Sequence, residues 1–122
     1  MAKECDKNLI NSKINGVDDG TIEIKEGSGG ELTGKHKKSN KPIAGQCTGG
    51  SPPHIMFARI GADGCVYIYQ GEMEKVLLPR EHYRIPPGKG TVTKICLPLA
   101  VNAKGRGIDR TPDEWVAEQD PT

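Results

Sequence analysis

A cysteine between glycines is the residue of this chain best placed for covalent chemistry. Cys47 lies in the segment Gly-Gln-Cys-Thr-Gly-Gly, residues 45–50. A cysteine on a tight glycine-rich turn exposes its sulfur and leaves backbone N–H groups free to bind an oxyanion. Attack by the thiolate also requires a base within hydrogen-bonding distance. The histidines available for that role are His36, His54 and His82.

The surroundings of Cys47 resemble the glycine-flanked nucleophile of chymotrypsin-like cysteine proteases over residues 45–50. This resemblance implies a small cysteine-dependent enzyme with Cys47 as its nucleophile. The chain is short for the two-barrel fold of those proteases. We therefore favour the simpler interpretation, in which a small cysteine packs beside a glycine-rich turn.

Residues 29–36 come close to the phosphate-binding loop GxxxxGK[ST], and they follow a segment with a strand pattern. His36 stands where that loop needs a hydroxyl group to bind magnesium. Residues 37–42 are too polar to form the apolar-faced helix whose N-terminus supports the phosphates. We therefore interpret the match as a coincidence within a glycine-rich segment.

The cysteines and histidines also offer donor atoms for a metal ion. Cys65 and Cys96 lie inside segments with strand patterns, where a thiol is an ordinary part of a core. None of the four cysteines forms the close pair typical of a structural zinc site. The sequence therefore predicts neither a metal site nor another cofactor.

Basic and aromatic side chains indicate a second kind of site, a surface that binds an extended ligand. Lysines are concentrated between residues 35 and 41, where they could contact phosphates, and nearby tyrosines could stack on bases. The formal net charge of only +1 argues against a dedicated nucleic-acid binder. A weak single-stranded nucleic-acid binder stays open as an alternative. The candidate ligand-binding residues are Lys35, Lys37, Lys38, Lys41, Tyr67, Tyr69, Arg80 and Arg84.

Composition places the chain among small, turn-rich domains. Its 122 residues are typical of a single domain, and 16 glycines with 9 prolines favour turns over long helices. No stretch approaches the ~20 apolar residues of a membrane-spanning helix, so we expect no membrane partner. The charged segment 1–7 is no secretory signal as written. We expect reduced cysteines and a cytoplasmic protein, with a processed secreted form as the alternative.

Apolar residues are distributed unevenly along the chain. Residues 54–101 hold 24 of them in 48 positions, whereas residues 1–53 hold 13 in 53. Because burial of apolar surface drives folding, we expect residues 54–101 to form the β core. Residues 27–53 are interpreted as a long loop rich in glycine and lysine, and residues 1–16 as an N-terminus that can fray.

The clearest local structure is a hairpin. Residues 54–60 and 65–70 are rich in β-branched and aromatic side chains, and Gly-Ala-Asp-Gly joins them. Both segments are apolar on both faces, so we place them at the centre of a sheet. Further strands are expected over residues 21–25, 75–78 and 91–97. The predicted fold is mainly β, a small antiparallel barrel or a strongly twisted sheet of five or six strands.

Helices are expected only near the C-terminus. Thr111-Pro112-Asp113-Glu114 is typical of a helix start with a capping residue, which predicts a short helix over residues 111–119 that docks through Trp115. A second short helix is expected over residues 98–104, because Pro98 lies in its first turn and Gly105 follows its end.

These observations favour a small non-catalytic binding or interaction module that acts through residues 27–53 and an adjacent sheet face. Its partner would be a protein or a single-stranded nucleic acid. The protein itself would be a monomer or a homodimer that pairs through a sheet edge. The cysteine enzyme is the alternative.

Overall fold

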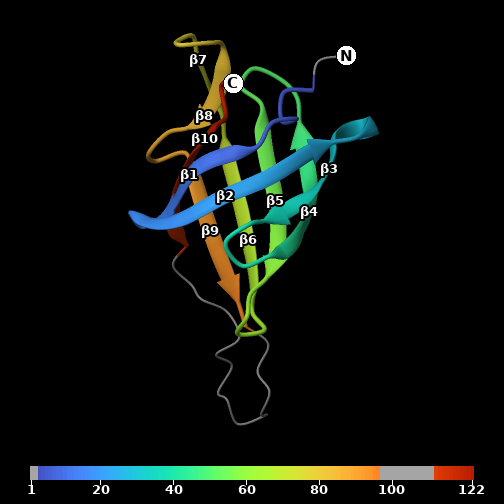
Figure 1. Ribbon diagram of the computed structural model, residues 1–122, viewed down its shortest axis with the longest axis vertical. Helices are drawn as coiled ribbons and strands as arrows, with labels where there is room; N and C mark the ends of the chain where they lie inside the picture. Colours follow the sequence, from blue (N-terminus) through green and yellow to red (C-terminus); the bar gives the residue numbers. More distant parts are fainter. Residues whose placement is uncertain (1–2, 97–111) are drawn as a thin grey trace.

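The computed structural model describes residues 3–96 and 112–122, and their regular structure is almost entirely strand. Eight antiparallel strands close into a barrel, because β10 pairs with β1 on one side and with β9 on the other. In Figure 1, β1 and β2 cross in front of β5, β6 and β9. The barrel strands, in spatial order, are β1 (Leu9–Ile14), β2 (Val17–Glu26), β3 (Glu31–His36), β4 (Lys41–Thr48), β5 (His54–Ile60), β6 (Val66–Glu72), β9 (Gly90–Ile95) and β10 (Asp113–Gln119).

The segment that connects β6 to β9 along the chain forms a hairpin that extends beyond the barrel. It consists of β7 (Glu74–Val76) and β8 (His82–Ile85), and it lies at the top of Figure 1. The second half of β10 pairs with β8, while the first half of β10 pairs with β9. A single 3₁₀ turn, η1 (Ser28–Gly30), is the only helical element in residues 3–96 and 112–122.

The mainly β prediction and the antiparallel barrel are confirmed, but two details of the fold prediction are wrong. The sheet has more than five or six strands, and residues 111–119 do not form a helix. Asp113–Gln119 is the strand β10, in which Trp115, Ala117 and Gln119 alternate into the interior. This period of two outweighs the helix-capping pattern that precedes it. The helix expected over residues 98–104 lies outside the described residues.

Residues 27–53 are not a long loop, because they contain η1, β3 and β4. The strands escaped prediction because several of their inward positions hold glycine or histidine, such as Gly34, His36 and Gly45. Residues 1–16 are likewise not a frayed end in the part described, since β1 pairs with both β2 and β10. The core therefore draws on both halves of the chain, and Leu9, Ile22 and Leu32 are as buried as Ile55 or Phe57.

Two irregular positions turn polar side chains of β1 and β2 into the barrel. The pairing register of these strands shifts between Leu9 and Ser12 and again near Gly20. Asn11 and Gly20 have left-handed backbones there, with φ of 55° and 81°. An inserted residue changes which face the following side chains occupy. As a result Ser12 and Asp19 point inward although they lie three residues from the inward Leu9 and Ile22.

An aromatic cluster fills the middle of the barrel. Phe57 stacks on Tyr69 with ring centroids 4.7 Å apart, and Trp115 meets both rings edge-on. All three side chains are at most 1% exposed. The interior is thus a packed core at this level, in which aromatic pairs add stability beyond the area they bury.

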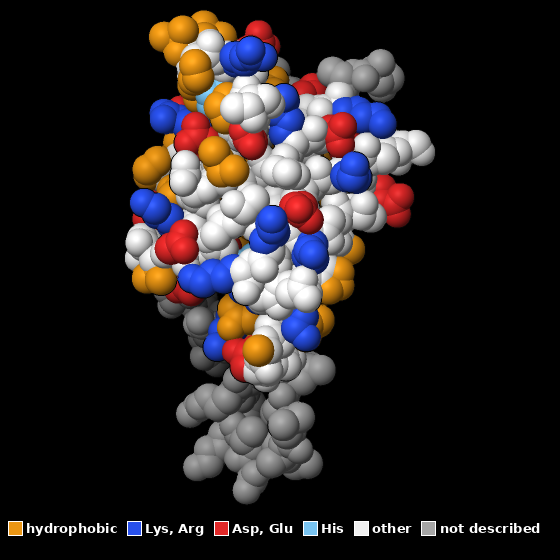
Figure 2. Space-filling model, in the orientation of Figure 1, with side chains coloured by type: hydrophobic (Ala, Val, Ile, Leu, Met, Phe, Trp, Pro, Cys, Tyr) orange, Lys and Arg blue, Asp and Glu red, His pale blue; other side chains and the backbone are white. Residues whose placement is uncertain are grey.

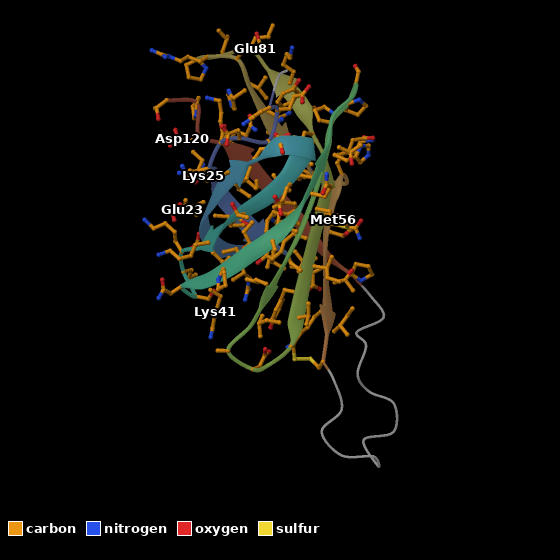
Figure 3. The ribbon with its side chains drawn as sticks, turned by 90° about the vertical axis from the view of Figure 1, so that its right-hand side faces the viewer. Glu23, Lys25, Lys41, Met56, Glu81 and Asp120 are labelled. Carbon is orange, nitrogen blue, oxygen red and sulfur yellow. A yellow bond between two sulfur atoms is a disulfide. The ribbon has the colours of Figure 1, made fainter. Side chains whose placement is uncertain are left out.

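All four cysteines are paired, so the expectation of reduced thiols is wrong. Cys5 is bonded to Cys47, and Cys65 is bonded to Cys96. The first disulfide ties the segment before β1 to the end of β4. The second joins the start of β6 to the residue after β9, at the lower end of the strands in Figure 3.

Within residues 3–96 and 112–122, no helix is long and apolar enough to cross a membrane.

Candidate interaction surface

In the structure Cys47 is part of a disulfide and is not the free thiol that a nucleophile requires. Its sulfur is bonded to that of Cys5, and the residue is only 4% exposed. A disulfide sulfur cannot act as the attacking thiolate. The same pairing affects Glu26, whose carboxylate lies with both sulfurs in the one group of close metal-ligand atoms found in the described residues. A metal there would require the disulfide to be reduced first.

The three candidate histidines lie in three different environments. His36 ends β3 and is buried in the barrel, whereas His54 begins β5 on the outside and contacts Glu72 at 3.5 Å. His82 begins β8 and is buried beneath the β7–β8 hairpin. The structure therefore does not bring them together as one base or one metal site.

The candidate ligand-binding residues are also dispersed. The lysines of the β3–β4 hairpin alternate with acids of β2: Lys37 lies 3.9 Å from Glu23, and Lys38 lies 3.7 Å from Asp18. Arg80 and Arg84 belong to the separate β7–β8 hairpin. These candidates therefore belong to two separate hairpins, and Lys37, Lys38 and Arg84 each lie near a carboxylate that reduces their net charge locally.

The two tyrosines do not form the base-stacking platform expected from the sequence. Tyr69 is fully buried in the aromatic cluster. The ring of Tyr67 is covered by the guanidinium of Arg59, which lies 4.3 Å from its centroid. Stacking on bases requires an open aromatic face. Tyr69 therefore offers no open face to a ligand outside the barrel, and Arg59 already covers one face of Tyr67.

A buried polar network, which the sequence did not reveal, centres on Asp19. Its carboxylate accepts hydrogen bonds from Ser12 at 2.9 Å, from Tyr69 at 3.0 Å and from His36 Nε2 at 2.9 Å. The Arg59 guanidinium lies 4.0 Å away. Burial alone would raise the pKa of Asp19. The hydrogen bonds that the carboxylate accepts from His36, Ser12 and Tyr69 hold that pKa below its usual value of 3.8.

Ser39, His36 and Asp19 form a hydroxyl–imidazole–carboxylate relay, the arrangement used in nucleophilic catalysis. His36 Nδ1 lies 2.7 Å from the Ser39 hydroxyl. The Ser39 backbone N–H donates to the same nitrogen at 3.2 Å, so Nδ1 is an acceptor and the proton of His36 lies on Nε2. Only Ser39 lies in the four-residue turn between β3 and β4, where it is half-buried, and His36 is only 2% exposed. We assign this relay to holding the turn against β2.

The outer face of four neighbouring strands has a different character, because it is neutral except at one end. Side chains of β4, β5, β6 and β9 alternate between the barrel interior and this face, and the register places the outward residues side by side. In a chain whose residues are 27% charged, twelve outward positions are neutral, and the outward His54 and Glu72 lie together at one end. This surface, here called the uncharged face, consists of Ala44, Gln46, Thr48, Met56, Ala58, Ile60, Val66, Ile68, Gln70, Thr91, Thr93 and Ile95.

The uncharged face includes large apolar side chains that the fold leaves in solvent. Met56 is 46% exposed and Ile60 is 52% exposed. A shallow hollow at one end of the face is lined by Met56, Gln70 and Thr91, among other residues. Beside it, Glu72 lies between His54 and Lys89, at 3.5 Å and 3.2 Å, so the charged groups gather at the margin.

The opposite side of the barrel is densely charged. Figure 2 shows Lys, Arg, Asp and Glu side chains spread over the side that carries β1 and β2. In Figure 3, Met56 points away from the barrel on the side opposite Glu23, Lys25 and Lys41. The molecule therefore has one ordinary solvated side and one side depleted of charge, and such depletion is typical of the centre of a protein interface.

The sequence does contain the signal for this face. Residues 54–60 and 65–70 are apolar on both faces, from which we predicted a central position, and β5 and β6 do lie between β4 and β9. The structure buries one side only.

A search with this chain against protein-family models, curated proteins and solved structures finds no match.

Proposed function

We propose that this protein is a non-catalytic interaction module that binds another protein surface through its uncharged face. The observation that carries the proposal is the run of neutral outward positions across four strands, with Met56 and Ile60 half exposed. Removing charged groups from water is costly, so a surface built for contact with protein is depleted of them. The disulfide at Cys47 and the filled barrel interior favour this function over the cysteine enzyme.

The partner that the uncharged face fits most simply is a second copy of this chain. Two such faces can pack together without opposing like charges, in the way that sheets pack about 10 Å apart in sandwiches. A nucleic acid fits less well, because the face offers no cation to its phosphates.

The size of the face determines how tight such a dimer would be. Four strands spaced about 4.8 Å apart span roughly 19 Å, and seven residues rising about 3.3 Å each span roughly 23 Å. The flat area is then about 440 Å² per copy, or about 900 Å² for the pair, less than the roughly 1,200 Å² of stable complexes. We therefore expect a weak dimer that depends on protein concentration.

Sedimentation velocity between about 10 µM and 1 mM tests the proposed dimer. The wild-type sedimentation coefficient is expected to rise with concentration, whereas Met56→Lys should remain monomeric because each copy adds a buried like charge. Val17→Lys is the matched control. It places the same charge at a 66% exposed apolar residue of β2, away from the uncharged face, and should associate like the wild type. A wild-type protein that stays monomeric at 1 mM contradicts the proposal.

We also infer that the protein works in an oxidising compartment rather than in the cytoplasm. Three of the four paired cysteines, Cys5, Cys47 and Cys65, are buried, and disulfides persist mainly outside the reducing cytosol. Purified protein denatured without reductant should release no thiol to Ellman's reagent. Four thiols per chain in protein taken directly from cells would contradict this inference.

A further inference from the structure

The β7–β8 hairpin ends in five consecutive exposed residues, Leu77-Leu78-Pro79-Arg80-Glu81. Leu77 is 67% exposed and Leu78 is 78% exposed, the highest values among the large apolar residues described. Figure 1 shows this hairpin projecting from the top of the barrel, and Figure 3 labels Glu81 at its end. These leucines contribute nothing to the core, and their exposure is typical of a contact surface.

The base of the hairpin holds the tip in a defined shape. Val76 pairs with His82 across the loop, and Lys75 Nζ reaches Glu81 at 2.9 Å. At the next residue pair away from the tip, Arg84 forms an ion pair with Glu74. A recognition loop fixed in advance loses little conformational entropy on binding, which strengthens the complex.

Arg80 is the distinctive residue of the tip. It follows Pro79 directly, and no carboxylate within residues 3–96 or 112–122 forms an ion pair with it. Its backbone carbonyl oxygen accepts a hydrogen bond from Nδ1 of His82 at 2.5 Å. The His82 side chain is only 1% exposed, so this bond is shielded from water.

We propose that the tip is an inhibitory loop for serine proteases of the trypsin type, with Arg80 as the residue that enters the specificity pocket. That pocket has a carboxylate at its base and an apolar wall, which complements a guanidinium on an exposed loop. Leu78 and Pro79 would contact the adjoining apolar surface of the enzyme. The tip shares no residue with the uncharged face, so this proposal is independent of the proposed dimer.

The hydrogen bond to the Arg80 carbonyl explains why the loop would inhibit rather than be cut. Hydrolysis of the bond between Arg80 and Glu81 requires that carbonyl oxygen to accept hydrogen bonds from the oxyanion hole of the enzyme. Here Nδ1 of His82 already donates a hydrogen bond to that carbonyl oxygen from inside the hairpin. His82 is thus a positioning residue that withholds the peptide bond while the Arg80 side chain binds.

A membrane is a less suitable partner for the same tip. Two leucines and one arginine are fewer groups than lipid anchors need, since even one myristoyl chain gives only marginal binding. Cosedimentation with phosphatidylserine–phosphatidylcholine vesicles separates the two partners. Vesicle binding without protease inhibition overturns the proposal.

Inhibition of trypsin by the purified, disulfide-bonded protein is the first test. Hydrolysis of a chromogenic arginine substrate should be inhibited competitively, with an inhibition constant in the micromolar range or below. Arg80→Ala should weaken inhibition at least 100-fold, whereas Arg80→Lys should retain most of it, because the pocket accepts both cations. Lys25→Ala is the matched control, because it removes an exposed cation of β2 away from the hairpin, and it should inhibit like the wild type. Absence of inhibition by the wild type overturns the proposal.

Cleavage is the second test, because it probes His82 separately from binding. Mass spectrometry should find the Arg80–Glu81 bond of the wild type intact after hours with trypsin. His82→Leu should be cut after Arg80 at least 10-fold faster, and His82→Gln, which keeps a donor, should be cut more slowly than His82→Leu. Circular dichroism confirms that each variant is folded. A wild-type chain that is cut after Arg80 as fast as the reduced, unfolded chain overturns the inhibitory role.

Discussion

The buried carboxylate of Asp19 should be the most sensitive polar position in the molecule. Asp19→Ala removes the acceptor for Ser12, Tyr69 and His36, and it leaves the nearly buried Arg59 without its counter-ion. Removing one partner of a buried ion pair typically costs about 3–5 kcal/mol. Small domains are stable by only about 5–15 kcal/mol, so the substitution should remove a large part of the total.

Urea denaturation followed by circular dichroism measures this loss. With a slope of about 2 kcal/mol per molar urea, a loss of about 4 kcal/mol lowers the midpoint by about 2 M. Asp18→Ala is the neighbouring control, because the Asp18 side chain is 71% exposed and its contact with Lys38 is long at 3.7 Å. That variant should change stability by less than about 0.5 kcal/mol. Equal midpoints for the two variants would refute the role assigned to Asp19.

The same network predicts a specific dependence on pH. The folded state lowers the pKa of Asp19 below 3.8, so the ionised carboxylate contributes stability that is fully present above that value. This contribution is lost as the pH falls through the lower pKa of the folded state. The stability difference between the wild type and Asp19→Asn should therefore be constant near neutrality and shrink below about pH 4. A difference that grows on acidification would show that the folded state raises the pKa instead.

Three further outcomes follow from the packing. Trp115 is the only tryptophan and is fully buried, so its fluorescence should be blue-shifted and poorly quenched by acrylamide until the protein unfolds; an emission maximum near that of free tryptophan would contradict the position of β10. The Cys65–Cys96 bond spans 31 residues, so replacing both cysteines by serine should lower the free energy of unfolding by about 4 kcal/mol in thermal or urea melts, and no loss would contradict its structural role. Gly45→Ala should destabilise the barrel by more than about 2 kcal/mol, because the new Cβ would overlap the backbone of Met56 and Phe57; a neutral result would mean that β4 and β5 lie further apart than the structure shows.

Local sequence patterns predicted the β5–β6 hairpin correctly because both of its strands combine apolar side chains with a glycine-containing turn. Residues 54–60 and 65–70 match β5 and β6 to within a few residues. The same patterns could not show that only one face of these strands would be covered. Strands that are distant in sequence decide which face of β5 and β6 is buried, so the local sequence pattern does not contain this information.

The first half of the barrel escaped prediction for a different reason. Barrel strands need an inward side chain that fits, and at Gly34, His36 and Gly45 that side chain is absent or polar. Hydrophobic alternation therefore breaks down where another strand approaches closely or a polar network replaces apolar packing. An Asp-Gly pair is typical of a tight turn, but at Asp19-Gly20 the left-handed glycine lies at a bulge within β2.

The pairing of β1 with β10 places the first and last strands of the described structure side by side. Leu9 lies opposite Gln119, and Asp120 donates a backbone hydrogen bond to Asn8 at 2.8 Å. The barrel therefore cannot close during synthesis until the last strand has left the ribosome, and contacts so far apart in sequence slow folding. The same proximity makes the protein suitable for circular permutation, with a short peptide joining the ends and a new start at the tight Asn15-Gly16 turn between β1 and β2.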